Sequence, residues 1–492
     1  MKRQNFFKNL PLMLLTLLAG FLLLFRLGEN SLTNWDEAWL ASVAQDMVSH
    51  GDWLKPQWNG EPWFYEPPLL TLILAAIMKF LGNTEFLLRS FNAVSGLATV
   101  LITYLLAQLL FKNSTSILPS IEVKVKARLA GVFAALVLLS DIEFLFRSRQ
   151  INNDIPLTML LLLVFYATLQ FAKKNSTGWL VVASTSLSLA FLTKRASALL
   201  ILPTILFILI RNKHRFNKKA ILIGLTAFLA VVTPWFLFSY FQWGDIFIRR
   251  FFWGYTVAKV VSVNPETGIS WLFYINALKH AFKVWFLILP IALIWFAAYV
   301  RKNWQVTALL VYFLTFFIIL SLVPIKSSWF LLPIHPLAAI MIGGFLSHLA
   351  AASFTLRLSP GLKLSVMLGV LGIFVFQIAN WHDQFIVPET TRHQANLAQK
   401  VKQLTAPTET IFLDDDYLPV AVYYSQRRVV PLRFNRQIID SNVSIQLPIN
   451  SYILSNRETY PHLTLMDEKV FKQVETNGKL ILLRVEPRFE TK

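Results

Sequence analysis

Two adjacent carboxylates, Asp36 and Glu37, begin a segment with a four-residue apolar periodicity. Trp35, Trp39, Val43 and Met47 recur every four positions, which predicts an amphipathic helix that lies in the membrane interface. The carboxylates would lie in its first turn, where the helix dipole favours negative charge. Held at headgroup depth by tryptophan, a carboxylate can act as a general base toward a membrane-bound hydroxyl. The same residues also fit an ordinary helix start on a wetted surface, and the sequence leaves both interpretations open.

The elements that must position these carboxylates are apolar and long. Of the 492 residues, 55% are hydrophobic and only 15% are charged, whereas a soluble protein of this size carries about 25% charged residues. Runs such as 10–25 and 220–238 are typical of membrane-spanning helices. We therefore expect an α-helical polytopic membrane protein with about 11 to 13 transmembrane helices. This class excludes a cytosolic enzyme, and the lack of cysteine excludes disulfides, thiolate metal sites and cysteine nucleophiles.

Hydropathy divides the chain into a membrane domain, residues 1–384, and a soluble domain, residues 385–492. In the second part, short apolar runs alternate with helical patterns, which predicts a small C-terminal α/β domain. The apolar segment 68–81 is short for a span and fits a re-entrant or interfacial helix. The number of crossings between residues 68 and 146 therefore stays open.

The net charge is +19, from 46 Lys and Arg against 27 Asp and Glu. On a soluble protein this excess would suggest nucleic acid, but in a membrane protein basic residues gather in cytoplasmic loops. Their distribution places the N-terminus inside, with the first apolar run as an uncleaved span. The loops 27–67 and 242–282 and the C-terminal domain then face outward, and we expect the two loops to form the rim of a site.

Several cations break this rule because they lie at the outward ends of predicted spans. Taken singly, each of these cations can be explained as a side chain that extends to the lipid headgroups of the outer leaflet. Together they border the loops that carry Asp36 and Asp154, and arginine is well suited to a phosphodiester. We therefore hypothesise that a subset binds a phosphate group. The set comprises Arg147, Arg149, Lys194, Arg195, Arg249, Arg250 and Lys326, of which Lys194, Arg249, Arg250 and Lys326 are the main candidates.

Other polar groups carry less weight. Asp141 and Glu143 end a predicted span and fit either a cavity or outward solvation. His335, between Ile334 and a proline, fits a packing residue better than a metal ligand. The three aspartates 414–416 look like a metal motif, but a strand end of this kind is more often a solvated turn.

An ordered set of short motifs extends over roughly residues 10–350. It is similar to the motifs of GT-C glycosyltransferases, above all the bacterial aminoarabinose–lipid A transferases and the dolichyl-phosphate-mannose protein mannosyltransferases. The first outward loop is the most specific part of this resemblance. The matching motifs are Asp36-Glu37, Gly51-Asp52-Trp53, Asn59-Gly60, Glu66-Pro67-Pro68-Leu69, Asn153-Asp154-Ile155-Pro156, Leu192-Thr193-Lys194, Phe251-Phe252-Trp253, and Lys326 followed by Phe330 and Pro333.

The resemblance implies transfer of a sugar from a polyprenyl-phosphate carrier to a lipid, protein or glycan acceptor, with inversion of the anomeric centre. It implies Asp36 as the catalytic base, with Glu37 beside it, and Asp154 as a second carboxylate near the acceptor or a metal. Negative charge that develops on the leaving phosphate must be met by cations or a metal. Whether a divalent metal takes part is left unknown. The expected location is the plasma (inner) membrane, with the site and the C-terminal domain on the external side, and nucleic acid is not an expected partner.

Three positions depart from the family pattern. Many relatives carry Glu-Lys before the two prolines, where the lysine contacts the donor phosphate, but this chain has Tyr65 and Glu66. Trp39 stands in the place of an expected arginine, and Thr256 in that of a histidine. Tyr65, Glu66 and Arg149 still count among the candidate substrate-binding residues. The phosphate clamp, however, must differ from that of the aminoarabinose transferases.

Two other classes of protein stay open at this point. A transporter or lipid flippase would carry paired carboxylates deep in its spans and an internal repeat, and neither is evident. In a non-catalytic membrane scaffold, the outward acidic and basic clusters would be incidental. The sugar, the acceptor and the oligomeric state are not readable from the sequence.

Overall fold

The computed structural model is mostly helical and describes residues 2–112, 120–214, 218–257, 272–300, 303–355, 360–381, 392–414, 417–432, 447–457 and 469–487. Its contacts divide the chain into two compact units. The first unit comprises Met1–Leu27, Phe64–Leu69 and Arg89–Val387. The second unit comprises Gly28–Trp63, Leu70–Leu88 and Pro388–Lys492.

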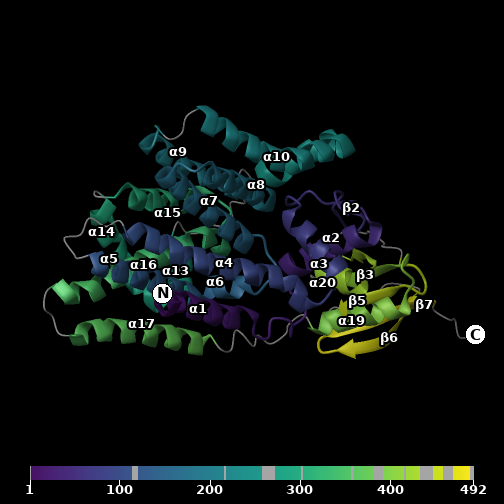
Figure 1. Ribbon diagram of the computed structural model, residues 1–492. Coiled ribbons are helices and arrows are strands. Elements are labelled where there is room, and N and C mark those ends of the chain that lie inside the picture. The colour runs from purple at the N-terminus through teal and green to yellow at the C-terminus, as the bar shows by residue number, and fades with distance from the viewer. Residues whose placement is uncertain are drawn as a thin grey trace, which may run out of the picture. The chain divides into compact units, whose positions relative to one another are not determined.

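The first unit is built from helices (Figure 1). Its apolar runs fold this way because a helix satisfies its own backbone groups where no water is present. Its elements are α1 (Lys2–Leu24), α4 (Glu85–Lys112), α5 (Ser120–Leu139), α6 (Ile142–Ser148), α7 (Asp154–Lys174), α8 (Thr177–Leu199), α9 (Leu202–Arg211), α10 (Lys218–Trp243), α11 (Asp245–Ile248), the π-helix η1 (Arg249–Val257), α13 (Phe273–Phe282), α14 (Val284–Val300), α15 (Trp304–Leu322), the 3-10 helix η2 (Ser328–Ile334), α16 (His335–Thr355) and α17 (Pro360–Asn380).

Five helices among the described residues are long and apolar enough to cross a membrane. Three further pairs are bent by 72°, 89° and 116° at short breaks, and they raise the number to 8 if each pair is one span. The chain is therefore a multi-pass membrane protein of the predicted helical class. The predicted number of spans is higher, in part because hydropathy separates α8 and α9 into two runs that the structure joins as one bent pair.

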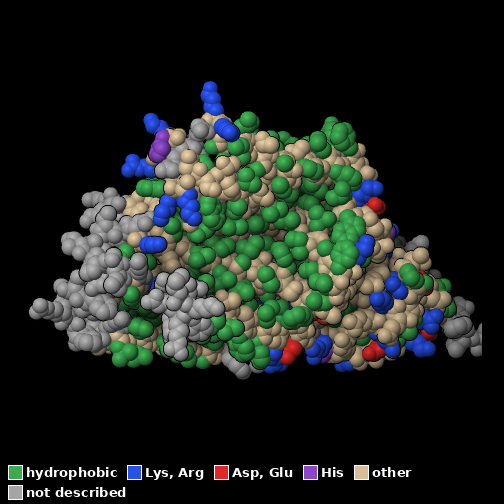
Figure 2. Space-filling model, in the orientation of Figure 1, with side chains coloured by type: hydrophobic (Ala, Val, Ile, Leu, Met, Phe, Trp, Pro, Cys, Tyr) green, Lys and Arg blue, Asp and Glu red, His purple; other side chains and the backbone are tan. Residues whose placement is uncertain are grey.

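Burial distinguishes the inner helices from those that face lipid. The most apolar stretch of α7 is 83% buried, whereas that of α10 is 11% buried. On α10, Ile221 and Leu222 are 56% and 63% exposed. Figure 2 shows apolar side chains across a broad face of the helices, with Lys and Arg at its margins. An apolar surface of this extent fits contact with acyl chains.

Two adjacent glycines of α16 allow close packing, Gly343 against α5 and Gly344 against the Phe111 ring of α4. A Cβ atom on Gly343 would lie 2.5 Å from the backbone nitrogen of Ala134, and one on Gly344 would lie 2.1 Å from the ring of Phe111. Small residues at helix interfaces allow backbones to approach in this way within membranes. The Gly343 contact therefore holds α16 next to α5.

The second unit contains an α/β fold with a five-stranded sheet (Figure 1). The strand order is β4-β3-β5-β7-β6; β3 is parallel to β4 and β5, and β7 is antiparallel to β5 and β6. This confirms the predicted small C-terminal α/β region. The elements are α2 (Asp36–His50), β1 (Gln57–Trp58), β2 (Glu61–Pro62), α3 (Leu69–Phe80), α19 (Arg392–Leu404), β3 (Thr410–Asp414), α20 (Leu418–Ser425), β4 (Arg428–Pro431), β5 (Tyr452–Asn456), β6 (Lys469–Asn477) and β7 (Leu480–Pro487).

Gly28–Trp63, which is most of the loop 27–67, belongs to this second unit together with the C-terminal fold. Helix α2 packs against α20, and its predicted apolar stripe is largely covered by protein. Val43 and Met47 are 0% and 1% exposed, whereas Trp35 is 50% exposed. The membrane-interface placement expected for this stripe can therefore apply to its Trp35 end but not to Val43 and Met47. The predicted division at residue 385 assigned this loop to the membrane domain, whereas its contacts group it with the C-terminal fold.

Candidate active site

The start of α7 holds the carboxylate of Asp154 in place. The side-chain oxygen of Asn152 accepts hydrogen bonds from the backbone N–H groups of Asp154 (3.0 Å) and Ile155 (3.1 Å). Asn152 thus satisfies two donors that a helix start leaves unpaired. Asp154 is 5% exposed, so its carboxylate is fixed at a buried helix terminus.

Asp154 forms an ion pair with Lys194, another residue predicted from the sequence. Lys194 Nζ lies 2.6 Å from Asp154 Oδ1, and the two side chains are 16% and 6% exposed. The ammonium also lies 4.8 Å from the centre of the Phe330 ring, within the range of a cation–π contact. The sequence brought all three residues to attention but did not predict that they meet.

A break in α8 makes this pairing possible. Lys194 has φ −149° and ψ 67°, which is not helical, although the helix continues on both sides. Arg195 follows directly and is 8% exposed. Its guanidinium donates to the carbonyl oxygen of Phe251 (2.5 Å) and to that of Tyr65. At this break the two neighbouring cations contact different partners. Lys194 contacts the carboxylate of Asp154, and Arg195 contacts two backbone carbonyls.

Arg195 connects the segment of Tyr65 and Glu66 with the π-helix η1. Its guanidinium carbon lies 4.3 Å from the centre of the Phe251 ring, so it contacts η1 through the ring as well as the carbonyl. Sequence reasoning counted Arg195 only as one of the outward cations. Its position directly after the Leu-Thr-Lys motif was the available signal.

A further cation, that of Arg147, lies over an aromatic ring in the same unit. Arg147 Cζ is 4.0 Å from the centre of the Trp329 ring, and its Nε is 3.3 Å from Glu143 Oε1. Ser328 donates a 3.3 Å hydrogen bond to the same Glu143 oxygen. The 3-10 helix η2 thus supplies two neighbouring rings, Trp329 and Phe330, each with a cation over it.

The end of η2 is held by a buried pair. His335 Nδ1 lies 2.7 Å from Asp141 Oδ2, and the two side chains are 2% and 0% exposed. The other carboxylate oxygen of Asp141 accepts from the backbone N–H of Phe144 (3.0 Å) and so caps α6. The predicted packing role of His335 fits its burial, but the carboxylate partner was not predicted.

The remaining predicted cations differ in their surroundings. Arg149 donates to the carbonyl oxygens of Leu22 (2.8 Å) and Phe25 (2.7 Å) at the end of α1. These bonds satisfy carbonyls that a helix end leaves unpaired, which is a structural role and gives no support to substrate binding. Lys326 Nζ donates to the carbonyl of Val323 at 2.6 Å. Arg249 and Arg250 are exposed at the start of η1, in positions where a ligand can reach them.

Asp36 and Glu37 lie in the second unit and are described within it. Asp36 is exposed at the first residue of α2. Glu37 is 0% exposed, and its Oε2 accepts from the backbone N–H (2.8 Å) and the hydroxyl (3.0 Å) of Thr33. Trp35 precedes the helix with φ +62°, an unfavourable conformation for a bulky residue. Of the two neighbouring carboxylates, the exposed one is accessible for chemistry and the buried one holds the turn.

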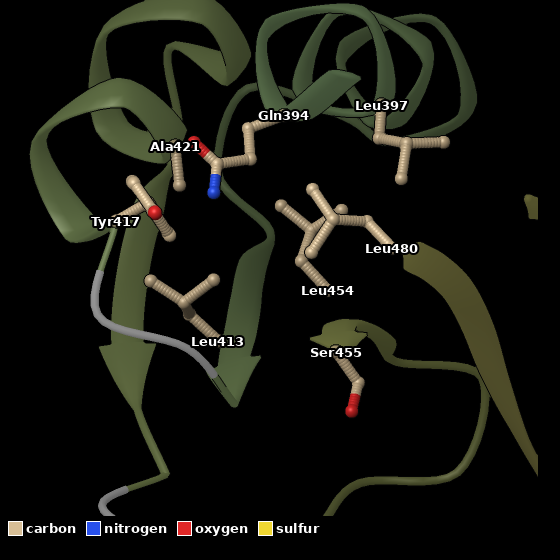
Figure 3. A pocket seen from close by; sticks show the side chains of 8 residues that line it. All are labelled: Gln394, Leu397, Leu413, Tyr417, Ala421, Leu454, Ser455 and Leu480. Carbon is tan, nitrogen blue, oxygen red and sulfur yellow. The ribbon is translucent and has the colours of Figure 1, made fainter. Parts of the chain in front are cut away.

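The described residues contain no group of three or more His, Asp or Glu that could hold a metal ion. Two of the three aspartates at 414–416 fall outside the described ranges. Asp414 itself is 5% exposed, and its Oδ2 accepts a 2.8 Å hydrogen bond from Ser455. A small apolar cavity in this unit lies between α19, α20 and the sheet (Figure 3) and has room for about one water molecule. Its size is below that of typical ligand sites.

Comparison with known proteins agrees with this architecture. The dolichyl-phosphate-mannose-protein mannosyltransferase family matches residues 65–238. An undecaprenyl phosphate-α-4-amino-4-deoxy-L-arabinose arabinosyl transferase of Pseudomonas savastanoi pv. phaseolicola is 29% identical over 348 residues, which are 68% of this chain and 61% of that protein. An uncharacterised protein of Aquifex aeolicus is 26% identical over 345 residues, 68% of this chain and 64% of that protein. The chain thus aligns with less than two thirds of the length of these relatives.

The fold itself matches over nearly the whole chain. The crystal structure of ArnT from Cupriavidus metallidurans bound to undecaprenyl phosphate superimposes with a TM-score of 0.75, at 16% sequence identity, over 96% of this chain and 97% of that one. The apo structure of the same protein gives a TM-score of 0.73. The architecture is that of a GT-C membrane protein. The chain thus shares the fold of ArnT and is similar in sequence to the protein mannosyltransferase family and to the aminoarabinose transferases.

Proposed function

We propose that the protein is a membrane glycosyltransferase that moves a sugar from a polyprenyl-phosphate carrier to an acceptor hydroxyl on the outer face of the inner membrane. The observation that carries this proposal is the buried Asp154–Lys194 pair beneath the Phe330 ring, in a chain with the GT-C fold. A buried cation next to an aromatic ring and a carboxylate suits recognition of an anionic headgroup. The solved neighbour of the same fold is bound to undecaprenyl phosphate, which supports this class of donor.

In the proposed reaction, Asp36 is the general base. Its carboxylate takes the proton of the acceptor hydroxyl as that oxygen attacks the anomeric carbon. The bond between the anomeric carbon and the phosphate oxygen breaks, and the electron pair leaves with the lipid phosphate. Attack from the face opposite the leaving group inverts the anomeric centre. The exposure of Asp36 at the first residue of α2 supports this role.

The leaving phosphate gains negative charge, and fixed cations would stabilise it most in a water-poor site. We assign this role to Lys194, held by Asp154, and to the exposed Arg249 and Arg250. Lys326 stays a further candidate. The carbonyl contacts of Arg195 would keep the segment of Tyr65 and Glu66 next to η1, and we propose Tyr65 and Glu66 as substrate-binding residues on that basis.

The test is transfer of radiolabel from polyprenyl-phosphate sugars to membrane extract by the purified protein. Asp36→Asn and Lys194→Gln should each lower product formation by about 100-fold or more, because each removes a group with a role in the transition state. The matched control is Asp46→Asn, which alters a carboxylate on the same helix that is paired with His50 at 3.2 Å. Full transfer by Asp36→Asn, or equal loss in the Asp46→Asn control, would refute the assignment of the base.

A further inference from the structure

The second unit contains a hydrogen-bonded connection from the C-terminal fold to the loop of Asp36. Tyr424, on α20, is 7% exposed. Its hydroxyl accepts from the backbone N–H of Leu32 (2.8 Å) and donates to Glu85 Oε1 (2.8 Å). Glu85 is the first residue of α4, a candidate span, and Leu32 lies four residues before Asp36. Glu85 belongs to the second unit, so within this unit a single phenol joins Glu85 to the entrance of the loop.

The connection continues to the carboxylates through Thr33. This residue follows Leu32, and both its N–H and its hydroxyl bond to Glu37 Oε2. Glu37 is fully buried and directly follows Asp36. The position of Leu32 therefore determines that of Thr33, which in turn fixes the first turn of α2. A shift at the phenol would pass along these bonds to Asp36.

The phenol must keep its proton for this arrangement, because it donates to one partner while it accepts from the other. Burial, reinforced by the neighbouring Glu85 carboxylate, raises the pKa of Tyr424 far above its usual value. The hydroxyl therefore stays protonated at any physiological pH. A buried phenol with two hydrogen-bond partners is costly to replace, because its removal leaves the backbone N–H of Leu32 without its acceptor.

A second connection holds the far side of the loop. The side-chain amide of Asn59, in the turn between β1 and β2, donates to the carbonyl of Val429 (2.8 Å) and accepts from its N–H (2.8 Å). Val429 lies on β4, an edge strand of the sheet. The amide thus occupies both hydrogen-bonding groups that an edge residue leaves open. The C-terminal fold is therefore hydrogen-bonded to the loop at two points, at Leu32 before α2 and at Asn59 after it.

We propose that the C-terminal α/β fold is a positioning device for the catalytic loop, in which Tyr424 and the Asn59–Val429 pair set the placement of Asp36. This proposal rests on the proposed function, since it takes Asp36 as the base. Tyr424 and Asn59 are positioning residues, because they act through the loop and not on the substrate. Their loss would change the chemical step while leaving the cations of the first unit intact.

The test compares Tyr424→Phe with Tyr423→Phe in the full-length protein. Tyr423 is the matched control: it is 5% exposed, its ring contacts that of Tyr424, and its hydroxyl donates to Asn83 (2.7 Å). We expect Tyr424→Phe to lower kcat by about 10- to 100-fold, as small displacements of reacting groups do. The KM for the polyprenyl-phosphate donor should stay within about twofold, and Tyr423→Phe should retain turnover.

Hydrogen exchange measured by mass spectrometry gives a readout that does not depend on activity. In Tyr424→Phe, peptides that cover residues 30–38 should exchange faster than in the unmodified protein and in Tyr423→Phe. Peptides of the first-unit helices should exchange as before. An unchanged kcat in Tyr424→Phe, or an equal loss in both variants, would overturn the proposal.

Asn59→Ala is an independent variant that removes the hydrogen bonds between Asn59 and Val429. It also tests the proposal if Tyr424→Phe does not fold. It should also lower kcat with little change in the donor KM, and normal turnover in this variant would count against the proposal. Asp36→Asn separates the two levels of the argument. If it stays active, the proposed function fails; if it is inactive while Tyr424→Phe and Asn59→Ala turn over normally, only the positioning role fails.

Discussion

The buried pair between Asp154 and Lys194 allows stability and catalysis to be separated. Replacing Asp154 with asparagine leaves the ammonium of Lys194 without its 2.6 Å partner in a site where the lysine side chain is 16% exposed. Replacing Lys194 with methionine leaves the carboxylate, 6% exposed, in the same position. A double variant, Asp154→Leu with Lys194→Met, removes both charges and fills the site with apolar atoms.

The expected magnitudes follow from the cost of an unpaired buried charge. Breaking a buried pair from one side destabilises a protein by about 3–5 kcal/mol, whereas replacing both partners with apolar residues is often nearly neutral. Each single variant should therefore lower the unfolding free energy by about 3 kcal/mol or more. The double variant should recover most of that loss. Turnover should stay low in all three, because the ammonium that we assign to the phosphate is either misplaced or absent.

The assay combines denaturant unfolding in detergent micelles with the radiolabel transfer assay on the same preparations. Recovery of stability without recovery of turnover supports a catalytic role for the charges. Full turnover by the double variant would refute the reasoning, since the pair would then be a structural element alone. Equal stability of all three variants would show that the pair is too well solvated for the burial argument to apply.

Three further outcomes are expected from other contacts. Arg195→Lys should destabilise the protein by about 1.5–3 kcal/mol and lower turnover, because a lysine cannot reach both carbonyls in the fork of a guanidinium; unchanged unfolding would contradict this. Above about pH 10, the free energy of unfolding should fall with rising pH, because Tyr424 ionises in the unfolded chain while its raised pKa keeps the folded phenol neutral. In unfolding measured as a function of pH, Tyr424→Phe should make this fall shallower. His335→Ala should lower the thermal midpoint, because it leaves the 0% exposed Asp141 without its 2.7 Å partner; an unchanged midpoint would argue against that pair.

The sequence alone was sufficient for the class of fold, and it drew attention to two residues that the structure brings together. Asp154 stood out through the Asn153-Asp154-Ile155-Pro156 motif, and Lys194 stood out as a cation at the predicted outward end of a span. Their pairing was not predictable, since they are 40 positions apart and meet only because the helix breaks at Lys194. Arg149 shows the opposite limit: an outward arginine looks the same in sequence whether it binds a phosphate or, as here, caps the end of another helix.

Contacts across long stretches of sequence account for what was missed. Tyr424 and Leu32 are 392 positions apart, and neither belongs to a motif. The predicted division at residue 385 followed hydropathy, which reports the medium around a segment and not its packing partners. The first loop was therefore assigned to the membrane domain although its contacts lie with the C-terminal fold.

The contact between Asn59 and Val429 has a consequence for any attempt to produce the C-terminal fold separately. It covers part of β4, one of the two edge strands of the five-stranded sheet. The opposite edge, β6, carries a β-bulge between Gln473 and Glu475 and several charged side chains, features that discourage strands of other molecules from pairing there. A fragment that starts near residue 385 would lack Asn59 and present an open β4 edge, and we expect it to self-associate through that edge.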